Sequence, residues 1–294
     1  MHNGYMGKIL RVDLTSETIT VEEPSPDFYR KHMGGSALNL YYLLKEMPAK
    51  VDALAPENIL GLSVGVTTGV SISGQSRMTA TAKSPLTGAI GDSQCGGFWP
   101  AKLKFAGFDG IIIKGKAAKP VYLWVDDGKA ELRDASHLWG KVTGEAEAAI
   151  KDELGDSKIE VLQIGPGGEK MVRFAGLINM CNRANGRTGM GAVMGSKNLK
   201  AVAVRGDTKP QVADKEGLQE LKKWGAKTFP TADVAGLGKL GTAGVVSVQH
   251  AEGGLPTYNF NSGVFDGWEA IDGQTLYDTL LAGSQEGQQD RKGR

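Results

Sequence analysis

The hydrophobic and polar positions at the start of the chain predict a β-hairpin followed by a broken helical segment. Apolar residues alternate with polar ones in Lys8–Leu14 and again in Thr18–Val21, and the short polar segment Thr15–Glu17 separates the two runs. A period of two on either side of a polar turn is typical of paired antiparallel strands. From Pro26 to Glu46 the apolar residues recur at helical spacing, and Gly34-Gly35 interrupts them. We therefore expect helix on both sides of these glycines.

The middle of the chain predicts a β-rich region with one clear helix. Between Ile59 and Leu132, short β-branched runs alternate with Gly, Ser, Thr and Pro. Apolar runs bounded by such turn residues are typical of strands. Beyond them, Thr143–Leu154 has the period of an amphipathic helix. The clearest predicted strands are Ile111–Ile113, Val121–Val125, Glu160–Ile164 and Leu199–Val204.

Two segments in this region, each made of a predicted strand and the residues that follow it, resemble one another. Phe108–Pro120 and Leu199–Pro210 each run from an apolar strand through a basic residue and a glycine to a Lys-Pro pair. A duplicated unit would produce such an echo, and so would chance. We expect an α+β fold with a β-rich N-terminal domain over residues 1–210, and the echo leaves open whether this domain is a duplicated unit with one helix in each half.

After residue 210 the pattern favours helices over strands. The helical period appears in Asp214–Thr228, in the glycine-interrupted Gly236–His250 and in Leu276–Leu281. The last segment, Gln285–Arg294, consists of polar residues and glycine and lacks the apolar side chains needed to pack. We expect residues 211–294 to be the truncated beginning of an all-α C-terminal domain, because the apolar faces of these helices would otherwise lack a partner.

Composition and charge exclude several classes of function. Of the 294 residues, 34 are basic and 33 acidic, so the net charge of +1 offers no footprint for nucleic acid or an anionic membrane. The N-terminus lacks the pattern of a signal peptide, and no apolar run is long enough to span a bilayer. Two isolated cysteines, Cys95 and Cys181, exclude a disulfide scaffold. We expect a cytoplasmic protein with neither a nucleic-acid nor a membrane partner.

Glycine is the outlier, with 42 of 294 residues, about twice its usual share. Three glycine-rich segments also carry arginines or rows of small hydroxyl and amide side chains: Gly69–Arg77, Gly91–Phe98 and Asn182–Gly191. Exposed backbone N–H groups beside a guanidinium suit an organic phosphate or a flat polar heterocycle. For any one of these segments taken alone, turn glycines and surface arginines are the favoured explanation. The P-loop, the dinucleotide fingerprint and the serine-hydrolase elbow are absent from the sequence.

Taken together and in order, these segments and their neighbours resemble the aldehyde ferredoxin oxidoreductase family, whose members are tungsten, and sometimes molybdenum, bis-pterin enzymes. The resemblance runs with matching spacing from about Gly7 to Gly263. It is carried by Ser84–Gly88, Lys104–Asp109, Asp134–Gly140, Ile164–Glu169, Gly191–Lys200 and Gly254–Pro256.

The resemblance implies an N-terminal domain of two similar β-rich halves, with strands and one helix in each, which forms a base for two pterin cofactors. The four dithiolene sulfurs of these cofactors would hold the metal. It implies that one cofactor meets Arg77 and the loop Gln94-Cys95-Gly96-Gly97. The other would meet Arg183-Ala184-Asn185-Gly186-Arg187. It also implies a magnesium ion between the cofactor phosphates, bound by the backbone carbonyls of Gln94 and Ala184, and oxygen ligands are those that Mg²⁺ prefers. Cys95 is expected to be a packed loop thiol rather than a metal ligand, and no catalytic side chain can be assigned.

The same resemblance implies oxidation of an aldehyde, or a related small molecule, to a carboxylic acid. Electrons would pass through a [4Fe–4S] cluster to ferredoxin or an electron-transfer subunit, and a homodimer is compatible with the family. Cys95 and Cys181 lack the spacing of cluster ligands, so we expect the cluster only in a longer enzyme. Truncation and a natural split subunit both stay open. The alternative functions are a non-catalytic pterin-binding fragment or subunit, and a β-rich ligand-binding protein whose glycines serve only turns.

Overall fold

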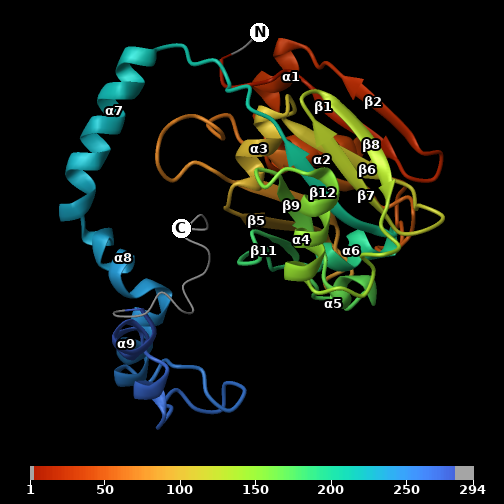
Figure 1. Cartoon of the computed structure of the whole chain (residues 1–294). Coiled ribbons are helices and arrows are strands. Elements are labelled where there is room, and N and C mark those ends of the chain that lie inside the picture. Colours follow the sequence, from red (N-terminus) through yellow and green to blue (C-terminus); the bar gives the residue numbers. More distant parts are fainter. Residues whose placement is uncertain (1–2, 282–294) are drawn as a thin grey trace. The chain divides into compact units, whose positions relative to one another are not determined.

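The computed structural model describes residues 3–281, and the predicted tail Gln285–Arg294 lies outside the described residues (Figure 1). The chain divides into two compact units, Met1–Lys215 and Glu216–Arg294. All the strands that the structure describes belong to the first unit. The first unit is therefore the β-rich part of the chain.

The first half of this unit begins with the predicted hairpin and broken helical segment, and both are confirmed. The helix ahead of the break is capped by Ser25, whose Oγ accepts a hydrogen bond from the Phe28 N–H. The break falls at Gly34-Gly35, where both residues have positive φ, a conformation that favours glycine. The elements are β1 (Ile9–Asp13), β2 (Thr18–Glu22), α1 (Pro26–Lys31), α2 (Ser36–Glu46), β3 (Leu60–Val64), β4 (Met78–Lys83), β5 (Ile90–Cys95), α3 (Trp99–Phe105) and β6 (Gly110–Lys114).

The second half repeats the order of the strands, but it has one helix rather than two after its second strand and a short additional helix, Pro166–Glu169, after its third. Its amphipathic helix spans Thr143–Leu154, as the sequence predicts, and ends at Gly155, which adopts the left-handed conformation of a helix C-cap. The predicted strands are present too. The elements are β7 (Val121–Asp126), β8 (Lys129–Asp134), α4 (Thr143–Leu154), β9 (Glu160–Gln163), α5 (Pro166–Glu169), β10 (Leu177–Asn179), β11 (Arg183–Asn185), α6 (Met190–Ser196) and β12 (Leu199–Arg205).

The two halves form two six-stranded sheets of identical topology. The strand orders are β2-β1-β6-β3-β4-β5 and β8-β7-β12-β9-β10-β11, and the only parallel neighbours are β1 with β6 and β7 with β12. The registers correspond as well, since Gly110 pairs with Ser63 and Ala201 pairs with Gln163. The predicted duplication is confirmed, and the two similar segments of the sequence hold the equivalent strands β6 and β12.

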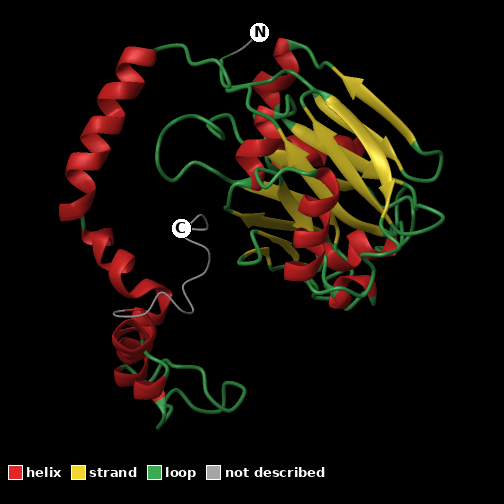
Figure 2. Ribbon diagram, viewed as in Figure 1, coloured by secondary structure: helices red, strands yellow, loops and turns green. Residues whose placement is uncertain are grey.

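Each half carries a helix between its fifth and sixth strands that the hydrophobic pattern did not predict, so the halves hold more than the one helix each that we expected. These helices are α3 and α6, and both pack between the two sheets (Figure 2). The Trp99 indole Nε1–H of α3 donates to the Val202 carbonyl of β12 over 2.9 Å. The two halves are therefore fastened by helices that belong to one sheet and contact the other.

One hydrophobic core spans both halves. It joins residues of the first sheet, such as Leu62 and Ile111, to Leu123 and Val202 of the second, around Trp99. Two smaller clusters cover the outer faces: α1 and α2 pack on the first sheet, and α4 packs on the second. Because burial of apolar surface is the main favourable term in folding, the shared core makes the two halves one unit.

The second unit is helical, as predicted. Most of its large apolar side chains are exposed, including Leu221, Trp224 and Phe229. Among the residues that the structure describes, no helix has both the length and the apolar character that crossing a membrane requires. The elements are α7 (Lys215–Thr228), α8 (Leu237–Leu240), α9 (Val246–Ala251), α10 (Gly273–Leu276), the 3₁₀ turns Phe229–Thr231, Asp233–Gly236, Gly241–Val245 and Trp268–Ala270, and the π-helical turn Tyr277–Leu281.

Candidate cofactor site

The strands β5 and β11, which stand at the edges of their own sheets, lie against each other. They are equivalent strands. In the first half, one residue of β4 pairs with Ser63 on one side and with Gln94 on the other. In the second half, one residue of β10 pairs with Gln163 on one side and with Ala184 on the other. Because Ser63 and Gln163 are equivalent, Gln94 and Ala184 are equivalent too, as are the residues that follow each of them. The two predicted cofactor segments therefore meet as matching parts of a duplicated unit.

A buried polar cluster joins the two strands. The Cys95 thiol donates to Asn185 Oδ1 over 3.0 Å, and Asn185 Nδ2 donates to the Ser93 carbonyl over 2.6 Å. Asn179 Nδ2, from the end of β10, lies 3.2 Å from Cys95 Sγ and 3.2 Å from the Gly96 carbonyl. All of these side chains are buried. Hydrogen bonds in such surroundings are costly to leave unmade, so the cluster holds β5 and β11 together.

An open hollow of about 710 Å³ lies where the two strands meet. Its lining includes four of the predicted site residues, and Asp92 and Ser93 complete it. The four are Gln94, Ala184, Gly186 and Arg187.

The other six predicted residues are not part of the lining of this hollow, and they differ in exposure. Arg77 and Arg183 are exposed, and Gly96 and Gly97 are half-buried beside the loop. Cys95 and Asn185 are buried, so their side chains join the strands. The roles expected of the ten residues toward a cofactor stay predictions.

The electrostatics of the junction favour an anionic ligand at its rim and a neutral thiol at its centre. Burial raises the pKa of Cys95 to about 11, although the Asn179 hydrogen bond and the charges of Arg77 and Arg183 lower it. The thiol therefore keeps its proton at neutral pH and can donate to Asn185. Both guanidinium groups act on the same thiol from exposed positions, which places positive charge from each half around one point.

The residues present fit a phosphate-bearing polar heterocycle. Guanidinium groups bind phosphates through paired hydrogen bonds, and Arg187 supplies one at the hollow itself. Gly186 has open space where a side chain would begin, since only the Ala184 Cβ comes within 3.9 Å of that position. Backbone carbonyls at Gln94 and Ala184 are oxygen donors of the kind that Mg²⁺ takes. Among residues 3–281, no group of three His, Cys, Asp or Glu side chains converges on one point.

Sequence reasoning missed Asn179. It is fully buried, and its Oδ1 has no hydrogen-bond partner within the described part of the chain. The same oxygen lies so close to Gly97 that a Cβ there would come within 2.1 Å of it. Nothing in the sequence around Asn179 marks it, because the residue acquires its role only when β10 is placed beside the loop after β5.

The fold and the site define a domain of two equivalent halves, whose edge strands meet in a polar hollow that both Asp92 and Arg187 line. The chain belongs to the family described as the N-terminal domain of aldehyde ferredoxin oxidoreductase, and the match covers residues 9–206. These limits coincide with the first residue of β1 and the residue after β12. The family match thus encloses the duplicated pair of sheets.

Three relatives illustrate the family. The chain is 48% identical to the tungsten-containing aldehyde ferredoxin oxidoreductase of Pyrococcus abyssi over 90% of its length and 44% of the relative's. It is 46% identical to the enzyme of the same name from Pyrococcus horikoshii over 89% of the chain and 44% of that protein. A solved structure of the BamBC active-site complex of benzoyl coenzyme A reductase, in complex with 1,5-dienoyl-CoA, matches with a TM-score of 0.76 and 36% identity over 79% of this chain and 35% of that one. The chain therefore spans less than half the length of these relatives.

Proposed function

We propose that this chain supplies the base on which two pterin cofactors carry tungsten, or molybdenum, in an oxidoreductase that converts aldehydes to carboxylic acids. The observation that carries the proposal is the meeting of β5 and β11, which brings Gln94 and Ala184 to one hollow from the two halves. The names of the Pyrococcus relatives support tungsten and an aldehyde substrate.

The chain's own residues bind and orient in this proposal. Arg77 and the loop Gln94–Gly97 hold one cofactor, and Arg183–Arg187 holds the other, with guanidinium groups facing phosphates. The carbonyls of Gln94 and Ala184 bind a magnesium ion between them. When bound, the cofactors supply the redox chemistry, and the protein supplies position and electrostatics.

The wider assembly is part of the same proposal. Electrons leave through a [4Fe–4S] cluster held elsewhere in a longer enzyme and reach ferredoxin or an electron-transfer subunit. The enzyme is cytoplasmic and compatible with a homodimer, and residues 211–294 open its helical domain. Of the two free cysteines, Cys95 is buried in the strand junction and Cys181 is exposed. They occur in different surroundings, and neither is assigned to the cluster.

Elemental analysis tests the proposal. The chain is purified anaerobically from a host that makes the pterin cofactor, and tungsten, molybdenum, magnesium and iron are measured per chain. We expect near-stoichiometric tungsten or molybdenum without iron, and a large loss of that metal in Arg77→Ala and Arg183→Ala. Arg133→Ala is the matched control, because Arg133 lies on β8, at the opposite edge of its sheet from β11.

The outcomes separate the readings. Folded protein without tungsten or molybdenum would contradict the proposal, and four irons per chain would overturn the interpretation of the cysteines. Because we expect the cluster only in a longer enzyme, the dye assay is made on that enzyme. Bound metal without aldehyde-dependent reduction of a viologen dye there would favour the non-catalytic pterin-binding fragment or subunit.

A further inference from the structure

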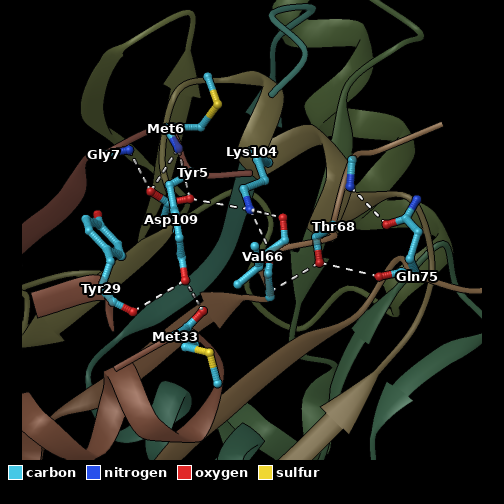
Figure 3. Close-up of polar contacts among 12 residues, drawn as sticks. Tyr5, Met6, Gly7, Tyr29, Met33, Val66, Thr68, Gln75, Lys104 and Asp109 are labelled. Atoms are coloured by element: carbon cyan, nitrogen blue, oxygen red, sulfur yellow. Dashed lines mark hydrogen bonds and ion pairs between the residues drawn. The ribbon is translucent and has the colours of Figure 1, made fainter. Parts of the chain in front are cut away.

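The first cofactor segment is continuous with helix α3, and the other end of α3 carries a buried lysine. Lys104 has no exposed surface. Its Nζ donates to the Gly65 carbonyl over 2.7 Å and to the Val66 carbonyl over 3.2 Å (Figure 3). Gly65 and Val66 begin the loop 65–77, which connects β3 to β4 and ends at Arg77. Lys104 thus holds the start of the loop 65–77 by hydrogen bonds, and the last residue of this loop is Arg77 of the proposed site.

A series of hydrogen bonds connects Gly65, which Lys104 holds, to Arg77. The Gly65 N–H donates to Thr68 Oγ1 over 3.2 Å, and the Thr68 hydroxyl lies 3.2 Å from the Arg77 carbonyl and 3.4 Å from that of Gln75. Thr68 is buried. One side chain therefore connects the residue held by Lys104 to the backbone of Arg77.

The side-chain amide of Gln75 forms hydrogen bonds to the backbone within the same loop. Its Oε1 accepts from the Gly69 N–H over 3.0 Å, and its Nε2 donates to the Val70 carbonyl over 2.7 Å. The loop is therefore a fixed turn between its two ends, and a displacement of Gly65 is passed to Arg77.

Asp109 keeps Lys104 in place. One carboxylate oxygen lies 3.5 Å from Lys104 Nζ, and the same carboxylate accepts the N–H groups of Met6 and Gly7. A buried ammonium is costly unless an opposite charge and hydrogen bonds compensate it. Burial lowers the pKa of Lys104, and Asp109 opposes that shift. Through Met6 and Gly7, the N-terminal segment is hydrogen-bonded to the same Asp109 that pairs with Lys104 (Figure 3).

The second half places a lysine where the first half has the aspartate. Gly110 and Ala201 are equivalent, so the residues directly before them, Asp109 and Lys200, are equivalent as well. Lys200 is buried and forms an ion pair with Glu169.

This second buried pair fastens a different part of the fold. Lys200 Nζ donates to the Lys141 carbonyl over 2.9 Å, and Glu169 accepts the Gly140 N–H over 2.8 Å. The residue before β10, equivalent to Arg77, is Gly176. Only the first half therefore combines a buried lysine with a loop that ends in an arginine.

We propose that Lys104 is a positioning residue for Arg77, acting through Gly65 and Thr68. Helix α3 then sets both contacts of the first cofactor, since its start follows the loop Gln94–Gly97 and its end holds the loop 65–77. The inference rests on the proposed function for the role of Arg77 toward a cofactor, but the anchoring of the loop is independent of it.

Two measurements on the chain from a cofactor-producing host test the inference: amide hydrogen exchange and tungsten per chain. Lys104→Met should speed exchange in residues 65–77 by about tenfold and leave residues 138–141 and 166–176 unchanged. Lys200→Met, which also removes a buried ion pair, should show the reverse. Unchanged exchange in 65–77 of folded Lys104→Met would overturn the anchoring.

A double-mutant comparison tests the link to Arg77. If Lys104 acts through Arg77, the double variant Lys104→Met/Arg77→Ala should lose no more tungsten than Arg77→Ala alone. Additive losses would contradict positioning and indicate general destabilisation. Full tungsten in Arg77→Ala, with a loosened loop in Lys104→Met, would contradict the assigned role of Arg77 and leave the anchoring intact.

Thr68 gives a second route if Lys104→Met does not fold. Thr68→Ala removes the hydroxyl and should loosen 65–77 and lower tungsten, whereas Thr68→Ser keeps the hydroxyl and should restore both. Equal behaviour of the two variants would overturn the hydrogen-bonded path to Arg77.

Discussion

Cys95 and Asn185 occupy equivalent positions in the two halves and are hydrogen-bonded to each other, Sγ to Oδ1, over 3.0 Å. They lie 90 residues apart in the sequence. The residues directly before them, Gln94 and Ala184, line the hollow. A contact between the equivalent residues therefore sets the spacing between the two strands that present the proposed cofactor contacts.

Loss of the Cys95 donor should weaken this junction. Cys95→Ala leaves Asn185 Oδ1 buried without its donor, which we expect to cost about 1–3 kcal/mol of unfolding free energy. Cys95→Ser keeps an O–H donor and should retain most of the stability. Urea denaturation of the three proteins measures the difference. A Cys95→Ala protein as stable as the unaltered chain would show that the contact contributes nothing.

The two thiols should be poor nucleophiles at neutral pH. Burial raises the pKa of Cys95 from 9.0 to about 11. The pKa of Cys181 is also raised to about 11, because its thiol is partly desolvated and lies beside the Glu147 carboxylate, although the residue as a whole is exposed. Because the thiolate is the reactive form, such a shift lowers its share at pH 7 by about 100-fold. We expect iodoacetamide to modify exposed Cys181 slowly, faster as the pH approaches 11, and Cys95 only after unfolding. Peptide mass spectrometry follows both; rapid modification of Cys181 at pH 7 would contradict the raised pKa.

Two adjacent glycines should respond very differently to a methyl group. Gly97 has φ +107°, and a Cβ there would lie 2.1 Å from Asn179 Oδ1. Gly97→Ala should therefore cost about 2–4 kcal/mol. At Gly96 the nearest atom, the Ser76 carbonyl oxygen, would be 3.5 Å away, so Gly96→Ala should stay within about 0.5 kcal/mol of the unaltered chain. Thermal unfolding compares them, and equal melting temperatures would refute the clash.

Lys197 should make stability depend on alkaline pH. Burial lowers its pKa from 10.5 to about 8, although Glu57 and Asp13 oppose the shift. Between these two pH values the unfolded chain binds more protons than the folded one, so this group makes stability rise with pH. The total gain in unfolding free energy is about 3 kcal/mol. It is complete once the pH exceeds the pKa of Lys197 in the unfolded chain.

Lys197→Met provides the comparison. The variant loses the hydrogen bonds of Nζ to the Pro56 and Gly115 carbonyls, and it also loses the titration. The difference in unfolding free energy between the unaltered chain and the variant should therefore shift in favour of the unaltered chain from pH 8 to 10. A difference independent of pH would show that Lys197 titrates normally.

The sequence predicted two kinds of element. The hairpin Ile9–Glu22 and helix α4 have one face against the core and one toward solvent, which gives them clear periods. Strands β6 and β12 are almost wholly buried and were predicted as apolar runs bounded by turn residues. Helices α3 and α6 escaped prediction. All seven residues of α6 are buried, and α3 packs between both sheets, so neither has a polar face to give a helical period.

By itself the sequence determined the clearest strands, a hint of duplication in two similar segments, and the residue types of the segments proposed to hold the cofactors. Only the tertiary structure decided which residues of those segments face the hollow and which, like Cys95 and Asn185, are turned inward to join the strands. The partners of Asn179 and Lys104 were equally beyond sequence reasoning. The physical reason is that the partners lie tens of residues apart in the sequence. Such contacts form only when the sheets pack around shared helices, and the local hydrophobic period of a segment carries no information about them.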